Sequence, residues 1–133
     1  MTSRRGFLAF LLAGFLKNAD AQAAIEAMPF SSLRPGAALP PWLEPLTFRN
    51  QPRHTEFALV EDEGRTVLRA RSSAATSGLA REIAIDPARH PVIAWRWKVM
   101  NLIGKSDMAT REGDDFPARL YVSFGRRALC YVW

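Results

Sequence analysis

The stretch that most constrains the fold is residues 92–99, which read VIAWRWKV and alternate strictly between two kinds of side chain. Large apolar residues occupy every second position from Ile93, and alanine, arginine and lysine lie between them. A period of two is typical of a β-strand with one face in a core and the other toward solvent. We therefore expect a sheet with Trp95 and Trp97 on its core side, rather than exposed as a binding platform.

Similar strand signals recur along the chain. We expect strands at residues 55–60, 66–72, 78–85, 118–124 and 128–133, in addition to 92–99. The first two are joined by a loop of charged residues and one glycine, which predicts a hairpin. About six strands at spacings of roughly ten residues predict an all-β fold, either an antiparallel β-sandwich or a jelly roll.

The first 23 residues have the three parts of an export signal and are set apart from the fold. Arg4 and Arg5 form the basic start, residues 7–16 are apolar, and residues 21–23 (Ala-Gln-Ala) are typical of a cleavage site. The apolar run is too short for a stable membrane anchor, which needs roughly 20 residues. The Ser-Arg-Arg-x-Phe-Leu motif resembles a twin-arginine signal. We expect recognition by the export translocon through residues 1–23 and a periplasmic or secreted product.

The residues after the export signal can form at most one domain, because the whole sequence has only 133 residues. Six of its nine prolines lie in residues 29–52, which argues against a helix there and predicts an extended lead-in over residues 24–52. The β-sandwich is expected over residues 53–133. Trp133 ends the chain inside an apolar strand, and natural sheets protect such an edge. We therefore expect the sandwich to be incomplete at its C-terminus.

Several segments, in a fixed order, resemble one family of exported bacterial proteins. They are Val67-Leu68-Arg69-Ala70, Ser77-Gly78-Leu79, Asp86-Pro87, Trp95-Arg96-Trp97-Lys98-Val99 and the Gly-Asp-Asp-Phe-Pro-Ala-Arg-Leu-Tyr-Val run at 113–122. From about Trp42 to Trp133 the chain resembles the family catalogued as domain of unknown function 3047. The resemblance implies an exported domain that continues beyond a segment such as 131–133, which supports the expectation of a truncated chain. It implies no particular activity.

Composition and motifs argue against several classes of function. The formal net charge is +5, but three of the 18 cations lie in the first 23 residues and the others are dispersed, so we expect no nucleic-acid binding. The two histidines, His54 and His90, belong to no His-Glu-x-x-His motif, and no Gly-x-Ser-x-Gly elbow is present. The single cysteine, Cys130, alternates within an apolar strand, which predicts a small buried side chain. We expect no cofactor.

An acidic stretch around Gly113 is the candidate for a metal site. Its carboxylates are oxygen ligands of the kind that calcium prefers, and they belong to Asp107, Glu112, Asp114 and Asp115. Their spacing lacks the alternation of an EF-hand loop. We therefore prefer an interpretation in which Asp114 and Asp115 bond turn amides or pair with arginines such as Arg96 or Arg119.

A cationic sheet face is the sharpest functional prediction. The side chains expected on the non-core sides of their strands are Arg69, Arg71, Arg96, Lys98, Arg119 and Tyr121. Guanidinium groups bind carboxylates in a bidentate manner and a tyrosine ring packs on a sugar, so such a face suits an anionic saccharide. Trp42, in the lead-in, either clamps that segment to the sandwich or adds a stacking surface. A solvated face balanced by acidic neighbours is the competing interpretation.

Three functions fit these patterns. The one we prefer is an exported periplasmic β-sandwich protein that binds glycan or cell-envelope material and catalyses no reaction. The second is a carbohydrate-active enzyme of jelly-roll type, a polysaccharide lyase or hydrolase, in which Asp114 or Asp115 acts as base and Tyr121 or Arg119 stabilises charge on a uronate. The third is a subunit that assembles with a partner covering the open edge after Trp133.

Overall fold

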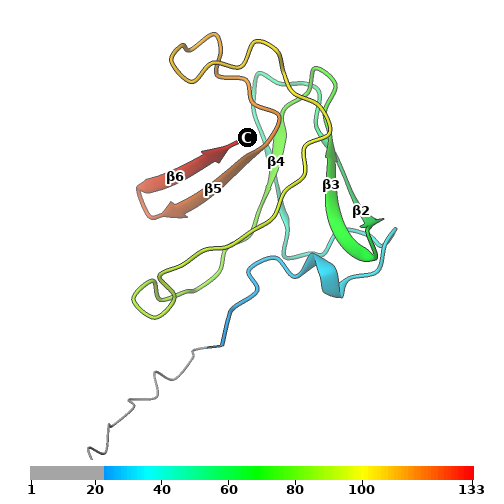
Figure 1. Cartoon of the computed structure of the whole chain (residues 1–133), viewed down its shortest axis with the longest axis vertical. Coiled ribbons are helices and arrows are strands. Elements are labelled where there is room, and N and C mark those ends of the chain that lie inside the picture. Colours follow the sequence, from blue (N-terminus) through cyan, green and yellow to red (C-terminus); the bar gives the residue numbers. More distant parts are fainter. Residues whose placement is uncertain (1–22) are drawn as a thin grey trace, which may run out of the picture. The chain divides into compact units, whose positions relative to one another are not determined.

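Antiparallel strand pairs make up the sheet structure of residues 23–133, the part of the chain that the computed structural model describes (Figure 1). The elements are η1 (Phe30–Ser32), β1 (Glu44–Thr47), β2 (Glu56–Asp62), β3 (Arg65–Arg71), β4 (Ser77–Ala80), β5 (Arg119–Phe124) and β6 (Arg127–Val132). The fold class is therefore all-β, as the alternation predicts. The strands form three two-stranded sheets, β1–β4, β2–β3 and β5–β6, and they do not close into a sandwich.

The described chain divides into two units, residues 23–91 and residues 92–133. The first contains η1 and β1 to β4, and the second contains β5 and β6. Apart from Ala23, the predicted export signal lies outside the described residues. Within residues 23–133, no helix has the length and apolar character needed to cross a membrane.

The β2–β3 hairpin of the first unit confirms the hairpin prediction. Its strands pair from Glu56 opposite Arg71 to Asp62 opposite Arg65. The two connecting residues, Glu63 and Gly64, have φ values of 50° and 75°. Two successive residues with positive φ are the requirement of a type I′ turn, whose twist matches that of the strands it joins. The turn therefore fixes the register of the hairpin.

The core of the first unit lies on one face of this hairpin. Leu59 is 2% exposed, and the neighbouring buried Thr66 donates a hydrogen bond from its hydroxyl to the Leu33 carbonyl at 2.7 Å. The Gly36 N–H donates to the Leu59 carbonyl at 2.8 Å. The proline-rich lead-in is thus bonded to the hairpin, and it also contains η1 and β1, two elements that the prediction of a merely extended segment missed.

The pairing of β1 with β4 is short. It runs from Glu44 opposite Ala80 to Thr47 opposite Ser77. The strand predicted over residues 78–85 therefore ends at Ala80, because its partner offers only four residues for pairing.

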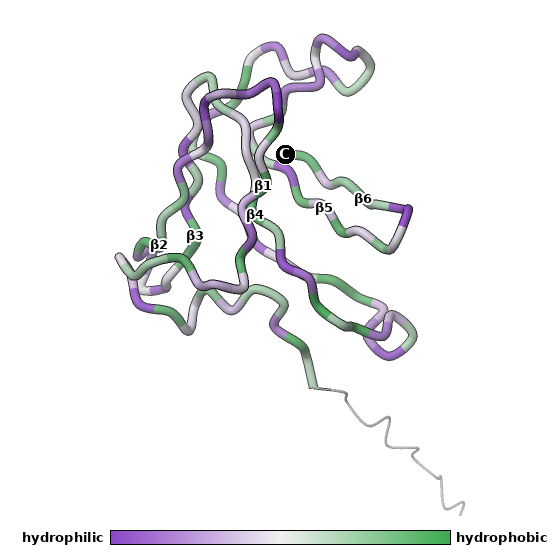
Figure 2. The backbone as a smooth tube through the Cα atoms, turned by 180° about the vertical axis from the view of Figure 1, so that it is seen from behind, coloured by the Kyte–Doolittle hydropathy of each residue, from purple (hydrophilic) through white to green (hydrophobic). Residues whose placement is uncertain are grey.

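The β5–β6 hairpin of the second unit matches the strands predicted at 118–124 and 128–133. Its register runs from Arg119 opposite Val132 to Phe124 opposite Arg127. Gly125, with φ of 57°, begins the two-residue turn, and Figure 2 shows hydrophilic colour where that turn joins greener strands. Cys130 is exposed, contrary to the prediction of burial. The hairpin is a single layer, so the face that Cys130 shares with its register partner Tyr121 stays open to solvent.

Residues 92–99 form no strand, which corrects the prediction made from their alternation. Aromatic contacts with the end of the chain hold this segment instead. The ring centroids of Trp95 and Tyr131 are 4.6 Å apart, and those of Trp97 and Trp133 are 5.8 Å apart. Trp95 and Trp97 are two residues apart, and so are their contact partners Tyr131 and Trp133. The side-chain period of two is therefore kept, although residues 92–99 form no strand. Trp95 remains 37% exposed, so the expected core side is only partly covered.

Candidate anion-binding site

The residues of the predicted cationic face are divided between the two units. Arg69 and Arg71 lie on β3 in the first unit, and Arg96, Lys98, Arg119 and Tyr121 lie in the second. On β3 the prediction of a two-sided strand holds in part: Arg69 and Arg71 are exposed and Thr66, on the other face, is buried, but Ala70, which alternation puts on the core side, is exposed. On β5, Tyr121 is exposed at 58% and the neighbouring Leu120 is half-buried.

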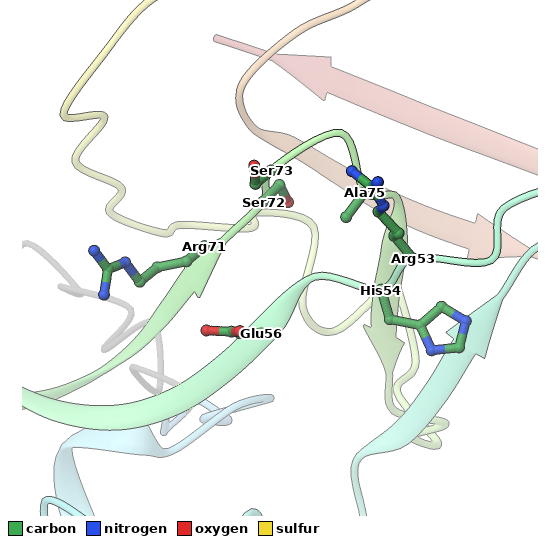
Figure 3. Close-up of a pocket in the computed structure, with 7 residues that line it drawn as sticks. All are labelled: Arg53, His54, Glu56, Arg71, Ser72, Ser73 and Ala75. Atoms are coloured by element: carbon green, nitrogen blue, oxygen red, sulfur yellow. The ribbon is translucent and has the colours of Figure 1, made fainter.

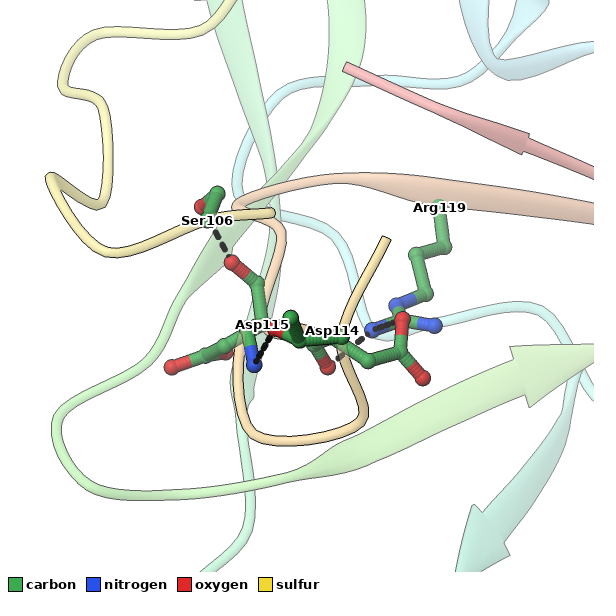
Figure 4. A network of polar contacts seen from close by, with 6 residues as sticks. Ser106, Asp114, Asp115 and Arg119 are labelled. Atoms are coloured by element: carbon green, nitrogen blue, oxygen red, sulfur yellow. Dashed lines mark hydrogen bonds and ion pairs between the residues drawn. The ribbon is translucent and has the colours of Figure 1, made fainter. Parts of the chain in front are cut away.

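Arg119 is bonded to the loop that precedes β5. Its Nη2 donates to the Asp114 carboxylate at 2.9 Å and to the Asp114 backbone carbonyl at 2.6 Å (Figure 4). Its guanidinium lies 5.4 Å from the centroid of the Phe116 ring. Burial lowers the pKa of Arg119, but hydrogen bonds to Asp114 and Tyr121 outweigh burial and leave the pKa raised. The preferred pairing of Asp114 with an arginine is thus confirmed. Asp114, Arg119 and Tyr121, three residues of the alternative lyase assignment, are linked by the hydrogen bonds of Arg119 and hold the loop against β5.

The acidic stretch folds into a turn. The Asp107 carboxylate accepts a hydrogen bond from the Ala109 N–H at 2.8 Å, and the Asp107 N–H donates to the Gly113 carbonyl at 2.7 Å. The Ser106 hydroxyl donates to the Asp115 backbone carbonyl, as Figure 4 shows. Across residues 23–133, no three metal-ligating side chains gather at a site that would hold an ion. The carboxylates singled out from the sequence are those of Asp107, Glu112, Asp114 and Asp115, and two of them accept hydrogen bonds: Asp107 from the Ala109 N–H and Asp114 from Arg119.

Trp42 takes the first of its two predicted roles, as a clamp on the lead-in. Its ring stacks with Phe30 at a centroid distance of 6.1 Å, and the Arg81 guanidinium lies 4.5 Å from its centroid. Arg81 also donates a hydrogen bond to the Ala27 carbonyl. A cation over a tryptophan face is a favourable electrostatic contact. This cluster joins η1 to the residue that follows β4.

An open pocket of about 600 Å³ lies at the end of the β2–β3 hairpin that is opposite its turn. Its lining residues are Arg53, His54, Glu56, Arg71, Ser72, Ser73 and Ala75. Glu56 and Arg71 are register partners. Figure 3 shows them on the paired strands, whereas Arg53 and the loop at 72–75 lie around the strand ends. Of the residues singled out from the sequence as a cationic face, this pocket contains Arg71.

Positive charge exceeds negative charge around this pocket. Arg53 and Arg71 bring two exposed guanidinium groups, and Glu56 brings one carboxylate. No hydrogen bond or ion pair formed within residues 23–133 uses either guanidinium. The hydroxyl group of Ser73 adds a neutral donor at the same rim. Guanidinium and hydroxyl donors together suit a carboxylate, sulfate or phosphate.

Hydrogen bonds hold the segment that carries Arg53 and His54. The Thr76 N–H donates to the Arg53 carbonyl at 3.2 Å, and the Thr55 N–H donates to Ser77 Oγ at 2.9 Å. The hydroxyls of Thr55 and Ser72 share a further hydrogen bond of 2.7 Å. These hydrogen bonds fix the backbone at Arg53, while the Arg53 side chain remains available to a ligand.

One family model matches the chain. It is described as a protein of unknown function (DUF3047) and covers residues 40–133. The match includes β1 to β6 and every residue that lines the pocket. Neither the curated proteins nor the solved structures contain a match to the chain.

Proposed function

This chain belongs to the DUF3047 family of proteins of unknown function, and we propose that it is an exported protein that binds an anionic saccharide or another acidic component of the cell envelope. The binding site in this proposal is the pocket between Arg53 and Arg71. Export rests on the basic, apolar and small-residue segments of residues 1–23. An exported protein would meet the components of the cell envelope, which is why the proposed ligand is one of them.

The observation that carries the proposal is the presence of two uncommitted guanidinium groups around one open pocket. Hydrogen bonds from a guanidinium to an anion are about twice as strong as those between neutral groups. Arg119, by contrast, already donates to Asp114. Arg119 is therefore less available to an anion than Arg53 and Arg71 are.

Glu56 favours a saccharide over a bare anion. A carboxylate only accepts hydrogen bonds, and it repels a second negative charge. Beside Arg71 it would accept hydrogen bonds from sugar hydroxyls while an arginine contacts a carboxylate of the same saccharide. Ser73 can both donate to and accept from such hydroxyls, and Ser72, whose hydroxyl already shares a hydrogen bond with Thr55, can still accept one.

The proposal is tested by electrophoresis of the full chain through native gels that contain polygalacturonate. We expect retardation that is lost when Arg53→Ala and Arg71→Ala are combined. Each substitution should weaken the interaction about tenfold or more, because each removes a charge-assisted contact. The matched control combines Arg49→Ala with Arg126→Ala, which removes the same charge from residues outside the pocket lining. Equal retardation of the two double variants would contradict the proposal.

A further inference from the structure

A second, largely apolar pocket adjoins the anion pocket in the first unit. It has a volume of about 260 Å³, and its apolar lining comes from Leu39, Pro45, Phe57 and Leu79. These residues belong to the lead-in and to β1, β2 and β4, so the pocket lies where the two strand pairs of the unit meet. A closed cavity of about 150 Å³ lined by such side chains binds benzene, so this pocket is large enough for one aromatic ring or a short acyl group.

His54 connects the two pockets, because it lines both of them. Figure 3 shows its imidazole pointing away from the Arg53 side chain. Thr55, the next residue, is fixed from both sides by its bonds to Ser77 Oγ and Ser72 Oγ. Ser77 lines the apolar pocket and Ser72 lines the anion pocket. The spacing of the two pockets is therefore set by hydrogen bonds.

We propose that the apolar pocket is a subsite for an apolar substituent, an aryl or short acyl group, carried by the same anionic saccharide. This inference rests on the proposed function, since the charged end of the ligand would lie against Arg53 and Arg71. A cationic pocket beside an apolar pocket favours a ligand that carries an anionic group beside an apolar group. Burial of the apolar group adds affinity in proportion to the area removed from water.

Calorimetric titration of the full chain with three probes tests the inference. The probes are D-glucuronate, phenyl β-D-glucuronide and phenyl β-D-glucoside. We expect phenyl glucuronide to bind about tenfold more tightly than glucuronate, as expected when one ring is buried. Phenyl glucoside, which lacks the carboxylate, should bind more weakly than phenyl glucuronide. Equal affinities for glucuronate and phenyl glucuronide would overturn the inference.

A variant in each pocket separates this inference from the proposed function. Leu39→Ser should remove the gain from the phenyl group and leave glucuronate binding unchanged, because Leu39 lines only the apolar pocket. Leu129→Ser removes an exposed leucine in the second unit and is the matched control. A phenyl gain that persists in Leu39→Ser would overturn the subsite. If the Leu39-dependent gain survives the Arg53→Ala and Arg71→Ala double variant with no loss of affinity, the proposed anion site is wrong and the apolar site stands.

Discussion

Gly113 shows how much a single position constrains the loop before β5. A Cβ atom built there would lie 2.5 Å from the Asp107 Cβ and 2.9 Å from the Asp107 backbone nitrogen. Gly113→Ala should therefore force the backbone apart and destabilise the protein by about 1–3 kcal/mol. Gly104→Ala is the matched control, because a Cβ at Gly104 meets no atom within 4 Å. Urea denaturation of both variants checks the prediction, and equal midpoints would contradict it.

The carboxylates around Gly113 also carry a prediction about metal ions. Asp107 and Asp114 already accept hydrogen bonds from the Ala109 N–H and from Arg119. Calcium would have to displace these contacts, so we expect millimolar calcium to leave the melting temperature unchanged. A ligand that binds the native state raises the melting temperature by mass action. Thermal denaturation with calcium and with EDTA makes the comparison. A reproducible rise of the melting temperature with calcium would contradict the expectation that these carboxylates bind no calcium.

At the residue scale, the sequence predicts local partners better than distant ones. Asp114 and Arg119 are only five residues apart, and their ion pair is among the pairings expected from the sequence. Arg53 and Arg71 line the same pocket, although the β2–β3 hairpin lies between them in the sequence. Arg53 is not among the site residues predicted from the sequence. The signal that was available is the two-residue turn at Glu63 and Gly64. That turn fixes the register and so places Arg71 opposite Glu56, near Arg53.

At the element scale, the β2–β3 turn limits which residues the hairpin tolerates. Gly64 has φ of 75° and open space around it, so a substitution there meets backbone strain rather than a steric clash. Gly64→Ala should cost about 1–2 kcal/mol, the usual penalty for a left-handed residue with a side chain. Gly104→Ala again serves as control, since Gly104 has no positive φ and also lies in open space. Thermal denaturation should show a lower midpoint for Gly64→Ala only; an unchanged midpoint would contradict the type I′ assignment.

The elements also show where periodicity is sufficient. Alternation predicts the exposure of Arg69 and Arg71 and the burial of the opposite face at Thr66, although that face is exposed at Ala70 near the strand end. Residues 92–99 alternate just as clearly, yet they form no strand. A strand requires a backbone partner, and periodicity contains no information about a partner that is distant in the sequence. The contacts of Trp95 and Trp97 keep the side-chain spacing that the pattern predicts.

At the scale of the whole molecule, the net charge of +5 attracts any polyanion. This attraction acts over distance and is screened at about 0.15 M salt, where the Debye length is about 8 Å. We therefore expect added salt to weaken polygalacturonate binding in every variant. Direct contacts are screened less, so the deficit of the Arg53→Ala and Arg71→Ala variant relative to the Arg49→Ala and Arg126→Ala control should persist. Affinity electrophoresis at two salt concentrations measures both effects; a deficit that vanishes with salt would contradict a built site.

Nuclear magnetic resonance of the arginine side chains tests the central claim most directly, because it identifies which guanidinium groups meet the ligand. The Nε–Hε signals of the full chain are followed during titration with D-glucuronate, and each is assigned by single Arg→Lys variants. The proposed pocket predicts saturable shifts for Arg53 and Arg71, with Arg119 and Arg126 little affected. Small, non-saturating shifts spread over all arginines, or saturable shifts confined to Arg69 or Arg96, would contradict the site.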